Sequence, residues 1–242
     1  MDSLGDRMKK YEKVSDFSLP IRTPIICRVD GRSFHQYTKR CKRPFDHGII
    51  NAMWQVAKAL CDEIAGAQLA YIQSDEISVL VHYYKKLDSQ PFVSNRIQKL
   101  CSITAGIASG VMTQESQLVF GEYRRAVFDS RVFSLPEAEV CNYFQWRQND
   151  WTRNSIQMLA HSLYSHKELH KKNRDDLQEM CFQAGSNWNN LSVFLKRGAC
   201  IVKENFVAED GATRSRWVVD REIPIFSKDR GYIEKHLQLE ES

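Results

Sequence analysis

The stretch IICRVDGRSFHQYTKR, residues 25–40, begins as an apolar segment and continues through an acid, a glycine and several basic residues. Its β-branched start predicts a buried strand over residues 23–29. Asp30–Gly31 is a common turn dipeptide, so a strand-ending turn alone would account for it. A second carboxylate from elsewhere in the chain is needed before these residues indicate a functional site.

Helices and strands alternate after this strand. Asp46 precedes a segment with apolar residues at three- and four-residue spacing, which predicts a helix with Asp46 as its N-cap. Ser74, Asp75 and Glu76 separate two apolar runs and predict a tight hairpin. The predicted elements are a helix over 47–65, strands over 68–73 and 77–83, a helix over 93–117 and a strand near 124–134. This β-α-β-β-α-β order is typical of a ferredoxin-like unit.

The pattern changes from Pro136 onward. Helices are predicted over 136–145, 150–165 and 173–184, followed by strands over 198–204 and 216–226. We therefore expect an α+β fold with a polymerase-palm-like antiparallel sheet that has helices on one face. Residues 1–135 would form this palm-like catalytic core, and residues 136–242 a helical and β extension that packs on it as one globular unit.

Composition narrows the class of protein. The chain has 242 residues, 43% of them hydrophobic, and a formal net charge of +4, which permits binding to polyanions without requiring it. The seven cysteines contain no CxxC pair, which argues against a structural zinc site. No apolar run is long enough for a membrane span, and the N-terminus lacks the apolar core of a secretory signal. These features predict a reduced, cytoplasmic protein without a membrane partner.

The expected topology brings two acids together. The first and second strands of a ferredoxin-like unit run parallel, and the third lies between them, antiparallel to both. The end of the first strand therefore meets the hairpin turn at one sheet edge, which makes Asp30 and Asp75 neighbours with Glu76 beside them. Paired carboxylates repel each other unless a cation or a proton lies between them. Because all-oxygen ligands suit Mg²⁺, we predict a magnesium site there.

The residues around the acids favour phosphate chemistry. Gly31 allows a ligand to approach the backbone, and the amides of residues 32–35 can cradle a triphosphate. Basic side chains that would supply counter-charge are Lys39, Arg40, Lys42 and Arg43 on the adjoining loop, and Arg96 and Lys99 on one helix face. Together with the carboxylates they indicate a two-metal nucleotidyl-transfer site. Polymerase palms and nucleotide cyclases share this geometry, so the spacing leaves both open.

Five motifs narrow the choice: RVDGRSFH, KRPFD, IQSDEIS, FDSRVF and YFQWRQND. They resemble, in order, the motifs of the tRNA(His) guanylyltransferase family, the reverse (3′-to-5′) nucleotide polymerases. The resemblance implies a palm-like fold, two Mg²⁺ ions, and ATP, GTP or other nucleoside triphosphates as substrates. It also implies tRNA as the partner and a homotetrameric assembly.

The resemblance implies roles for individual residues. Asp30, the Gly31 carbonyl and Asp75 match the metal ligands, and Glu76 matches the acid after the second ligand, so Asp30, Asp75 and Glu76 are the expected catalytic residues. The implied nucleotide site consists of Gly31, Arg32, Ser33, Phe34, His35, Arg43, Asp46 and Ser74. The residues that we expect at the tRNA 5′ end or a second triphosphate are Arg28, Lys42, Arg96, Lys99, Arg131, Arg153, Asn154, Lys172 and Asn173.

One departure bears on the substrate. Eukaryotic family members carry His-Ile-Asn-Asn after the Trp-Arg-Gln, and the histidine is linked with recognition of tRNA(His). This chain has Thr152, Arg153, Asn154 and Ser155 there, so it resembles the bacterial and archaeal branch that repairs 5′-truncated tRNAs. The expected function is template-directed 3′–5′ nucleotide addition to the tRNA 5′ end, as repair or as G addition to tRNA(His). The alternatives are a palm-type nucleotide cyclase and an inactive tRNA-binding module.

Overall fold

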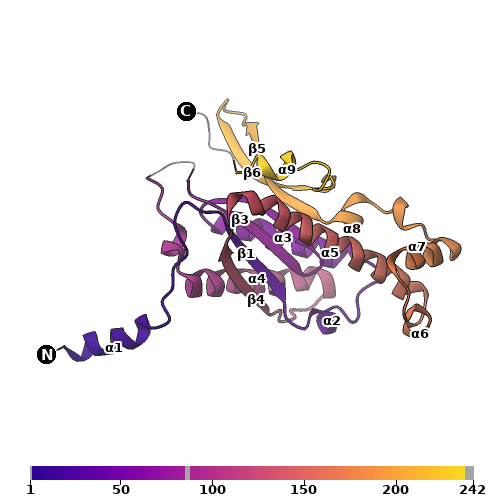
Figure 1. The fold of residues 1–242 in the computed structure, drawn as a ribbon, viewed down its shortest axis with the longest axis horizontal. Helices are drawn as coiled ribbons and strands as arrows, with labels where there is room; N and C mark the ends of the chain where they lie inside the picture. The colour runs from indigo at the N-terminus through magenta and orange to yellow at the C-terminus, as the bar shows by residue number, and fades with distance from the viewer. Residues whose placement is uncertain (1, 85–87, 238–242) are drawn as a thin grey trace.

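A six-stranded antiparallel sheet forms the centre of the computed structural model, which describes residues 2–84 and 88–237 (Figure 1). The strands are β1 (Ile25–Gly31), β2 (Ala67–Gln73), β3 (Glu76–Val81), β4 (Phe128–Ser134), β5 (Ala199–Val207) and β6 (Thr213–Asp220). Their order across the sheet is β4-β1-β3-β2-β5-β6. β3 pairs antiparallel with both β1 and β2, so β1 and β2 run parallel with β3 between them. The predicted α+β, palm-like fold is confirmed.

Helices cover both faces of the sheet. The three longest are α3 (His47–Glu63), α4 (Ile97–Phe120) and α5 (Glu137–Leu163). Because successive strand side chains point to opposite faces, Cys27 and Val29 of β1 pack in the core under α3 and α4. Ile26 of β1 and Leu80 of β3 pack instead with residues of α5. The two core helices thus share one face, as predicted, and the extension supplies the cover of the other.

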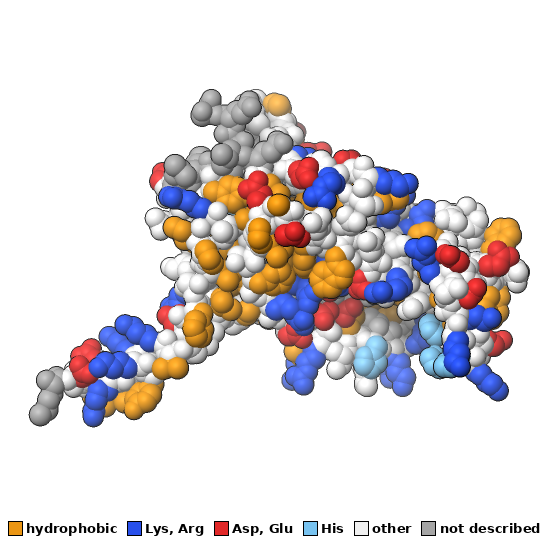
Figure 2. Space-filling view, viewed as in Figure 1, with side chains coloured by type: hydrophobic (Ala, Val, Ile, Leu, Met, Phe, Trp, Pro, Cys, Tyr) orange, Lys and Arg blue, Asp and Glu red, His pale blue; other side chains and the backbone are white. Residues whose placement is uncertain are grey.

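Shorter helices complete the chain. They are α1 (Leu4–Lys13), α2 (Phe34–Tyr37), η1 (Phe92–Asn95), α6 (His166–Leu169), α7 (Arg174–Gln183), η2 (Trp188–Asn190), α8 (Val193–Arg197) and α9 (Gly231–Glu234). α1 buries no residue and projects from the body, with basic and apolar side chains on its surface (Figures 1 and 2). In the described ranges no helix is both long and apolar enough to cross a membrane.

The predicted break between helices 136–145 and 150–165 is wrong, since α5 is one helix of 27 residues. Gln148, which lies in the expected gap, is buried with partners distant in sequence. Its Nε2 donates to the Pro224 carbonyl at 2.9 Å, and its Oε1 accepts from the Phe226 amide at 2.9 Å. Pro224 and Phe226 belong to the segment 216–226, which was predicted as a strand. β6 ends at Asp220, so the rest of that segment is not strand.

The C-terminal strands extend the sheet of the core. β5 pairs with β2, with Ile72 opposite Ala199 and Ala70 opposite Ile201. β5 continues into an antiparallel pairing with β6 that runs from Cys200 to Val207. Residues from beyond position 136 therefore cover one face of the sheet through α5 and prolong its edge through β5.

Candidate functional site

Two carboxylates meet at one edge of the sheet. Asp30 lies near the end of β1 and faces Glu76 of β3 in the strand register. Asp75 lies in the turn between β2 and β3, and its carbonyl accepts a hydrogen bond from the Gly31 amide at 3.2 Å. The structure therefore brings Asp30 and Asp75 together, as the topology predicted. Acidic and basic side chains gather where β1, β4 and α2 meet (Figure 2).

The electrostatics of this pair favour a bound cation. Burial raises the pKa of Asp75 to about 6, and the nearby Asp30 carboxylate contributes to the increase. The pKa of Asp30 is also raised, first by burial and then by the carboxylates of Glu76 and Asp129. Two acids that resist ionisation in each other's presence are stabilised in their charged form by a cation between them.

The close packing around Gly31 requires a glycine at this position. A Cβ atom there would lie 2.5 Å from Cδ2 of Phe34 and 3.0 Å from Cβ of Asp75. Only glycine therefore leaves the β1 end and the β2–β3 turn this close together. The donor set of two carboxylates and the Gly31 carbonyl is all oxygen, which suits Mg²⁺.

The predicted phosphate cradle is smaller than expected. The Arg32 amide donates to the Val127 carbonyl at 2.8 Å, so it is engaged next to β4 and does not face a ligand. Ser33 has a φ of 54°, in the left-handed region, and turns the chain into α2. The cradle of residues 32–35 is thus reduced to the amides of Ser33, Phe34 and His35.

A cavity of about 540 Å³ has Ser74, the residue before Asp75, in its lining, while Asp30 and Asp75 themselves do not line it. Its volume lies in the range typical of small-molecule sites. Its walls come from the α2–α3 loop, α3, the end of β2, α5 and α8. The lining includes the predicted residues Phe34, His35, Lys42, Arg43, Asp46, Ser74 and Asn154, and also Trp54, Trp151, Phe194 and Ala199.

Asp46 is the N-cap of α3, as predicted. Its Oδ1 accepts from the amides of Gly48 at 2.8 Å and Ile49 at 3.2 Å, and its Oδ2 accepts from the Lys42 amide at 2.8 Å. Burial opposes ionisation of this carboxyl, but the three backbone donors prevail and lower its pKa. Asp46 therefore fixes the basic loop against the start of α3, at the wall of the cavity.

Arg28 and Arg131 lie opposite each other on β1 and β4, two residues along from the Asp30–Asp129 pair. Residues two apart in a strand share a face, so both guanidinium groups are on the face of Asp30. Arg131 approaches Asp129 at 3.7 Å. These two arginines supply positive charge next to Asp30 and act to lower its pKa; their predicted contact with the tRNA 5′ end stays a prediction.

Four of the residues that were predicted at the tRNA 5′ end or a second triphosphate lie apart from the acid pair: Arg96, Lys99, Lys172 and Asn173. Arg96 directly precedes α4 and pairs with Asp16 at 2.5 Å, while Lys99 is exposed one turn further along. α4 runs antiparallel to β4, so its start lies away from the Asp30 edge. Lys172 and Asn173 are exposed before α7, where the Asn173 side chain accepts from the amides of Asp175 and Asp176.

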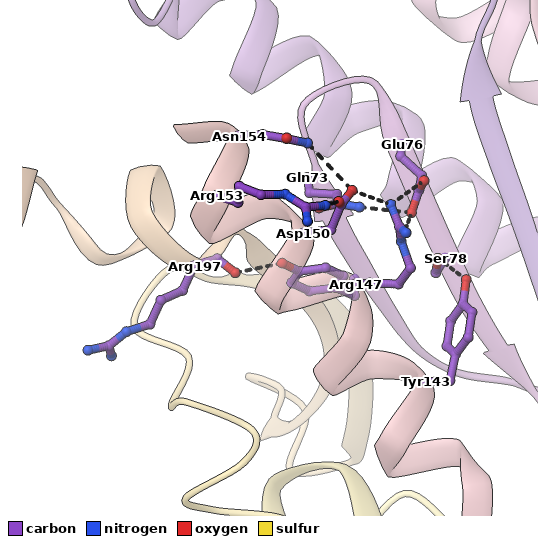
Figure 3. Close-up of polar contacts among 10 residues, drawn as sticks. Gln73, Glu76, Ser78, Tyr143, Arg147, Asp150, Arg153, Asn154 and Arg197 are labelled. Carbon is purple, nitrogen blue, oxygen red and sulfur yellow. Dashed lines mark hydrogen bonds and ion pairs between the residues drawn. The ribbon is translucent and has the colours of Figure 1, made fainter. Parts of the chain in front are cut away.

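Sequence reasoning missed the ion pairs behind the acid pair (Figure 3). Nε and Nη2 of Arg147 donate to the two carboxylate oxygens of Glu76 at 2.7 and 2.9 Å. Nη2 of Arg147 also donates to Asp150 at 2.9 Å, and Asp150 pairs with Arg153. The signal was available, because positions 147, 150 and 154 share one face of a helix.

An antiparallel palm-like sheet with paired carboxylates next to a ligand-sized cavity is the arrangement that the palm class of nucleotide-converting enzymes shares. The sequence model of the tRNAHis guanylyltransferase family matches residues 5–136, more than half of the chain. The chain belongs to this family.

Relatives agree with this placement. A bacterial tRNA(His) guanylyltransferase-like protein, solved in complex with ATP, is 44% identical with a TM-score of 0.92, over 98% of this chain and 100% of that one. A structure of such a protein in complex with GTP is 43% identical with a TM-score of 0.87, over the same shares of both chains. The tRNA(His) guanylyltransferase of Debaryomyces hansenii is 29% identical over 86% of this chain and 83% of its own.

Proposed function

We propose that this protein adds nucleotides to the 5′ end of tRNA in the 3′-to-5′ direction, directed by the opposite strand of the tRNA. The observation that carries this proposal is the Asp30–Asp75 pair at the edge of the cavity. Support comes from family membership and from the ATP and GTP complexes of the bacterial relatives. Thr152 to Ser155, which replace the histidine motif, favour repair of truncated tRNAs over a role confined to tRNA(His).

The proposed reaction has two stages. A tRNA 5′-monophosphate oxygen attacks the α-phosphorus of ATP, and pyrophosphate leaves; a tRNA 5′-triphosphate does not need this stage. The 3′-hydroxyl of the incoming nucleotide then attacks the α-phosphorus of the activated 5′ end. A new phosphorus–oxygen bond forms, the bond to AMP or pyrophosphate breaks, and the hydroxyl proton passes to solvent.

The chain's residues act mainly by position and charge. Asp30, Asp75 and the Gly31 carbonyl would hold two Mg²⁺ ions, which when bound lower the pKa of the attacking hydroxyl and neutralise phosphate charge. The amides of Ser33 to His35 with Arg43 would bind the triphosphate, and the cavity would take the base. Arg28 and Arg131 would bind the tRNA 5′ phosphate through their positive charge.

The test is extension of a tRNA that lacks its first nucleotide, with Mg²⁺ and each nucleoside triphosphate in turn. Two substrates are compared: tRNA(His) and an unrelated tRNA, each with a 5′-monophosphate or a 5′-triphosphate. We expect addition of the base that pairs with the 3′ strand on both tRNAs. Asp75→Asn should lower the rate at least about 100-fold, whereas the exposed Asp175→Asn should match the native protein.

Other outcomes of this experiment would support one of the alternative functions. Addition of G alone, and only to tRNA(His), would limit the enzyme to that tRNA. Conversion of ATP to a cyclic nucleotide without tRNA would indicate a cyclase. Binding of tRNA without any extension would indicate a binding module and would contradict the proposal.

A further inference from the structure

Both oxygens of the Glu76 carboxylate accept hydrogen bonds from neighbouring side chains. Its Oε1 accepts from Nε of Arg147 at 2.7 Å and from Nε2 of Gln73 at 3.0 Å. Its Oε2 accepts from Nη2 of Arg147 at 2.9 Å. A bidentate arginine–carboxylate pair of this kind fixes the geometry of both partners. Figure 3 shows the Arg147 side chain reaching from α5 to Glu76.

Arg147 is itself held in place from several sides. Its side chain is 8% exposed and lies 4.4 Å from the ring centre of Trp146. Its Nη2 also reaches Asp150, which accepts from Asn154 Nδ2 at 3.4 Å and pairs with Arg153. The guanidinium group therefore joins one carboxylate from β3 to one from α5. Without it the Glu76 carboxylate would lose this ion pair, whereas Asp150 would keep its pair with Arg153.

Glu76 follows Asp75 directly in the chain, so fixing Glu76 also fixes the turn that carries Asp75. The amide of Gly31 donates to the carbonyl of this turn at 3.2 Å. The chain of contacts thus runs from α5 through Arg147 and Glu76 to the edge where Asp30 and Asp75 meet.

We propose that Arg147 is a positioning residue, which holds Asp75 at metal-binding distance from Asp30 through its pair with Glu76, and that Glu76 acts in this pair rather than as a metal ligand. This revises the expectation that Glu76 takes part directly, and it rests on the proposed function of the acid pair. The same helix carries Asn154 in the cavity wall, so Arg147 also ties the nucleotide cavity to the acids.

Three variants test the pair: Glu76→Gln, Arg147→Gln and the double variant. Glu76→Gln keeps an acceptor for Arg147, whose charge is still balanced by Asp150. Arg147→Gln leaves the largely buried Glu76 carboxylate without its cationic partner, which is unfavourable, while Asp150 keeps its pair with Arg153. The double variant removes one charge of each sign and replaces the ion pair by two amides, so it remains informative if Arg147→Gln fails to fold.

The first readout is binding of Mn²⁺, as a probe for Mg²⁺, measured by electron paramagnetic resonance below the melting temperature of each variant. We expect Glu76→Gln to bind Mn²⁺ within about threefold of the native protein, since removal of a non-ligand changes affinity little. Arg147→Gln should weaken binding about 10- to 100-fold, the usual effect of losing a contact that orients a ligand. The double variant should recover most of the Mn²⁺ affinity that Arg147→Gln loses.

Two results would overturn the proposal. Glu76→Gln could lose Mn²⁺ binding as fully as Asp75→Asn, which would make Glu76 a ligand. Arg147→Gln could fold and bind Mn²⁺ like the native protein, which would make the pair merely structural. The matched controls are Glu204→Gln and Arg216→Gln, which disrupt an exposed pair at 2.9 Å between β5 and β6 and should leave Mn²⁺ binding unchanged.

The second readout is tRNA extension, which separates this proposal from the proposed function. Native protein that binds Mn²⁺ without extending tRNA would contradict the function but leave the role of Arg147 testable by metal binding. Where extension occurs, its rate should fall in Arg147→Gln by about 100-fold, as expected for a misplaced reacting group, and recover in the double variant.

Discussion

At the residue scale, the acid pair makes stability depend on pH. The folded pKa of Asp75, about 6, lies above the 3.8 of an unperturbed aspartate, so the folded state binds this proton more tightly than the unfolded chain. Stability from this group is complete below pH 4 and is lost as the pH rises to about 6. At pH 7 without divalent cations, Asp75→Asn should therefore be more stable than the native protein, by at most about 3 kcal/mol.

Urea unfolding of both proteins in EDTA at pH 4.5 and pH 7 measures this difference. We expect the advantage of Asp75→Asn to grow between the two pH values. Mg²⁺ at pH 7 should stabilise only the native protein, since a ligand stabilises the state that binds it. An Asp75→Asn variant that is less stable than the native protein at pH 7 in EDTA would show that the carboxylate is held by favourable contacts instead.

At the element scale, the junction of β1 and α2 depends on Gly31. In Gly31→Ala the new methyl would press on the Phe34 ring, which is buried and stacks on Tyr37 at 5.1 Å. Because the ring cannot move away freely, we expect a loss of about 1–3 kcal/mol in unfolding free energy. Displacement of the Asp75 turn by about 1 Å should also lower the extension rate about 100-fold.

Gly106→Ala is the matched control for this change. Gly106 is exposed within α4, and a Cβ atom there meets no atom within 4 Å. This variant should be more stable than the native protein by about 0.5–1 kcal/mol, because alanine favours a helix interior, and should keep its activity. Equal activity of Gly31→Ala and Gly106→Ala would mean that the site tolerates a shift of the turn.

Helices and strands could be predicted from the sequence where a local residue pattern determines them. The periodicity after Asp46 and its capping side chain gave α3, and the short gap at Ser74–Glu76 gave the hairpin. β4 was predicted near residues 124–134 and is present, but it begins only at Phe128, since the amides that precede and open the strand bond to side chains of α4. The Ala126 amide donates to Thr113 at 3.0 Å and the Phe128 amide to Ser109 at 2.9 Å. Only the tertiary structure brings these partners together.

At the scale of the whole molecule, the acids were predictable and the cavity was not. The β-α-β-β-α-β order alone places Asp30 next to Asp75, because strand order fixes which ends meet. The cavity combines α3 with α5 and α8, from distant parts of the chain, and no local pattern states that Trp54 and Phe194 pack at 5.5 Å. The Arg147–Glu76 pair escaped prediction for the same reason.

The pairing of β5, in the extension after residue 136, with β2 of the palm-like core depends on Gly198, the residue before β5. Its φ of 81° and ψ of −170° lie in a region open essentially to glycine alone. A Cβ atom there would lie 2.5 Å from the Ile72 carbonyl oxygen and 2.8 Å from the Tyr71 ring. Both obstacles belong to β2, so Gly198→Ala must push β5 away from the core sheet.

We expect Gly198→Ala to cost about 3 kcal/mol in unfolding free energy, the sum of backbone strain and overpacking. It should also weaken ATP binding about tenfold or more, a change of about 1.4 kcal/mol, because α8 and the start of β5 form a wall of the cavity.

The control is Gly121→Ala, which has a φ of 74° but open space around its Cβ position. It should cost only about 1 kcal/mol and leave ATP binding unchanged. Urea unfolding and calorimetric titration with ATP measure both effects. Normal ATP binding by a destabilised Gly198→Ala would show that the cavity belongs to the core alone, whereas a joint loss would show that the extension completes it.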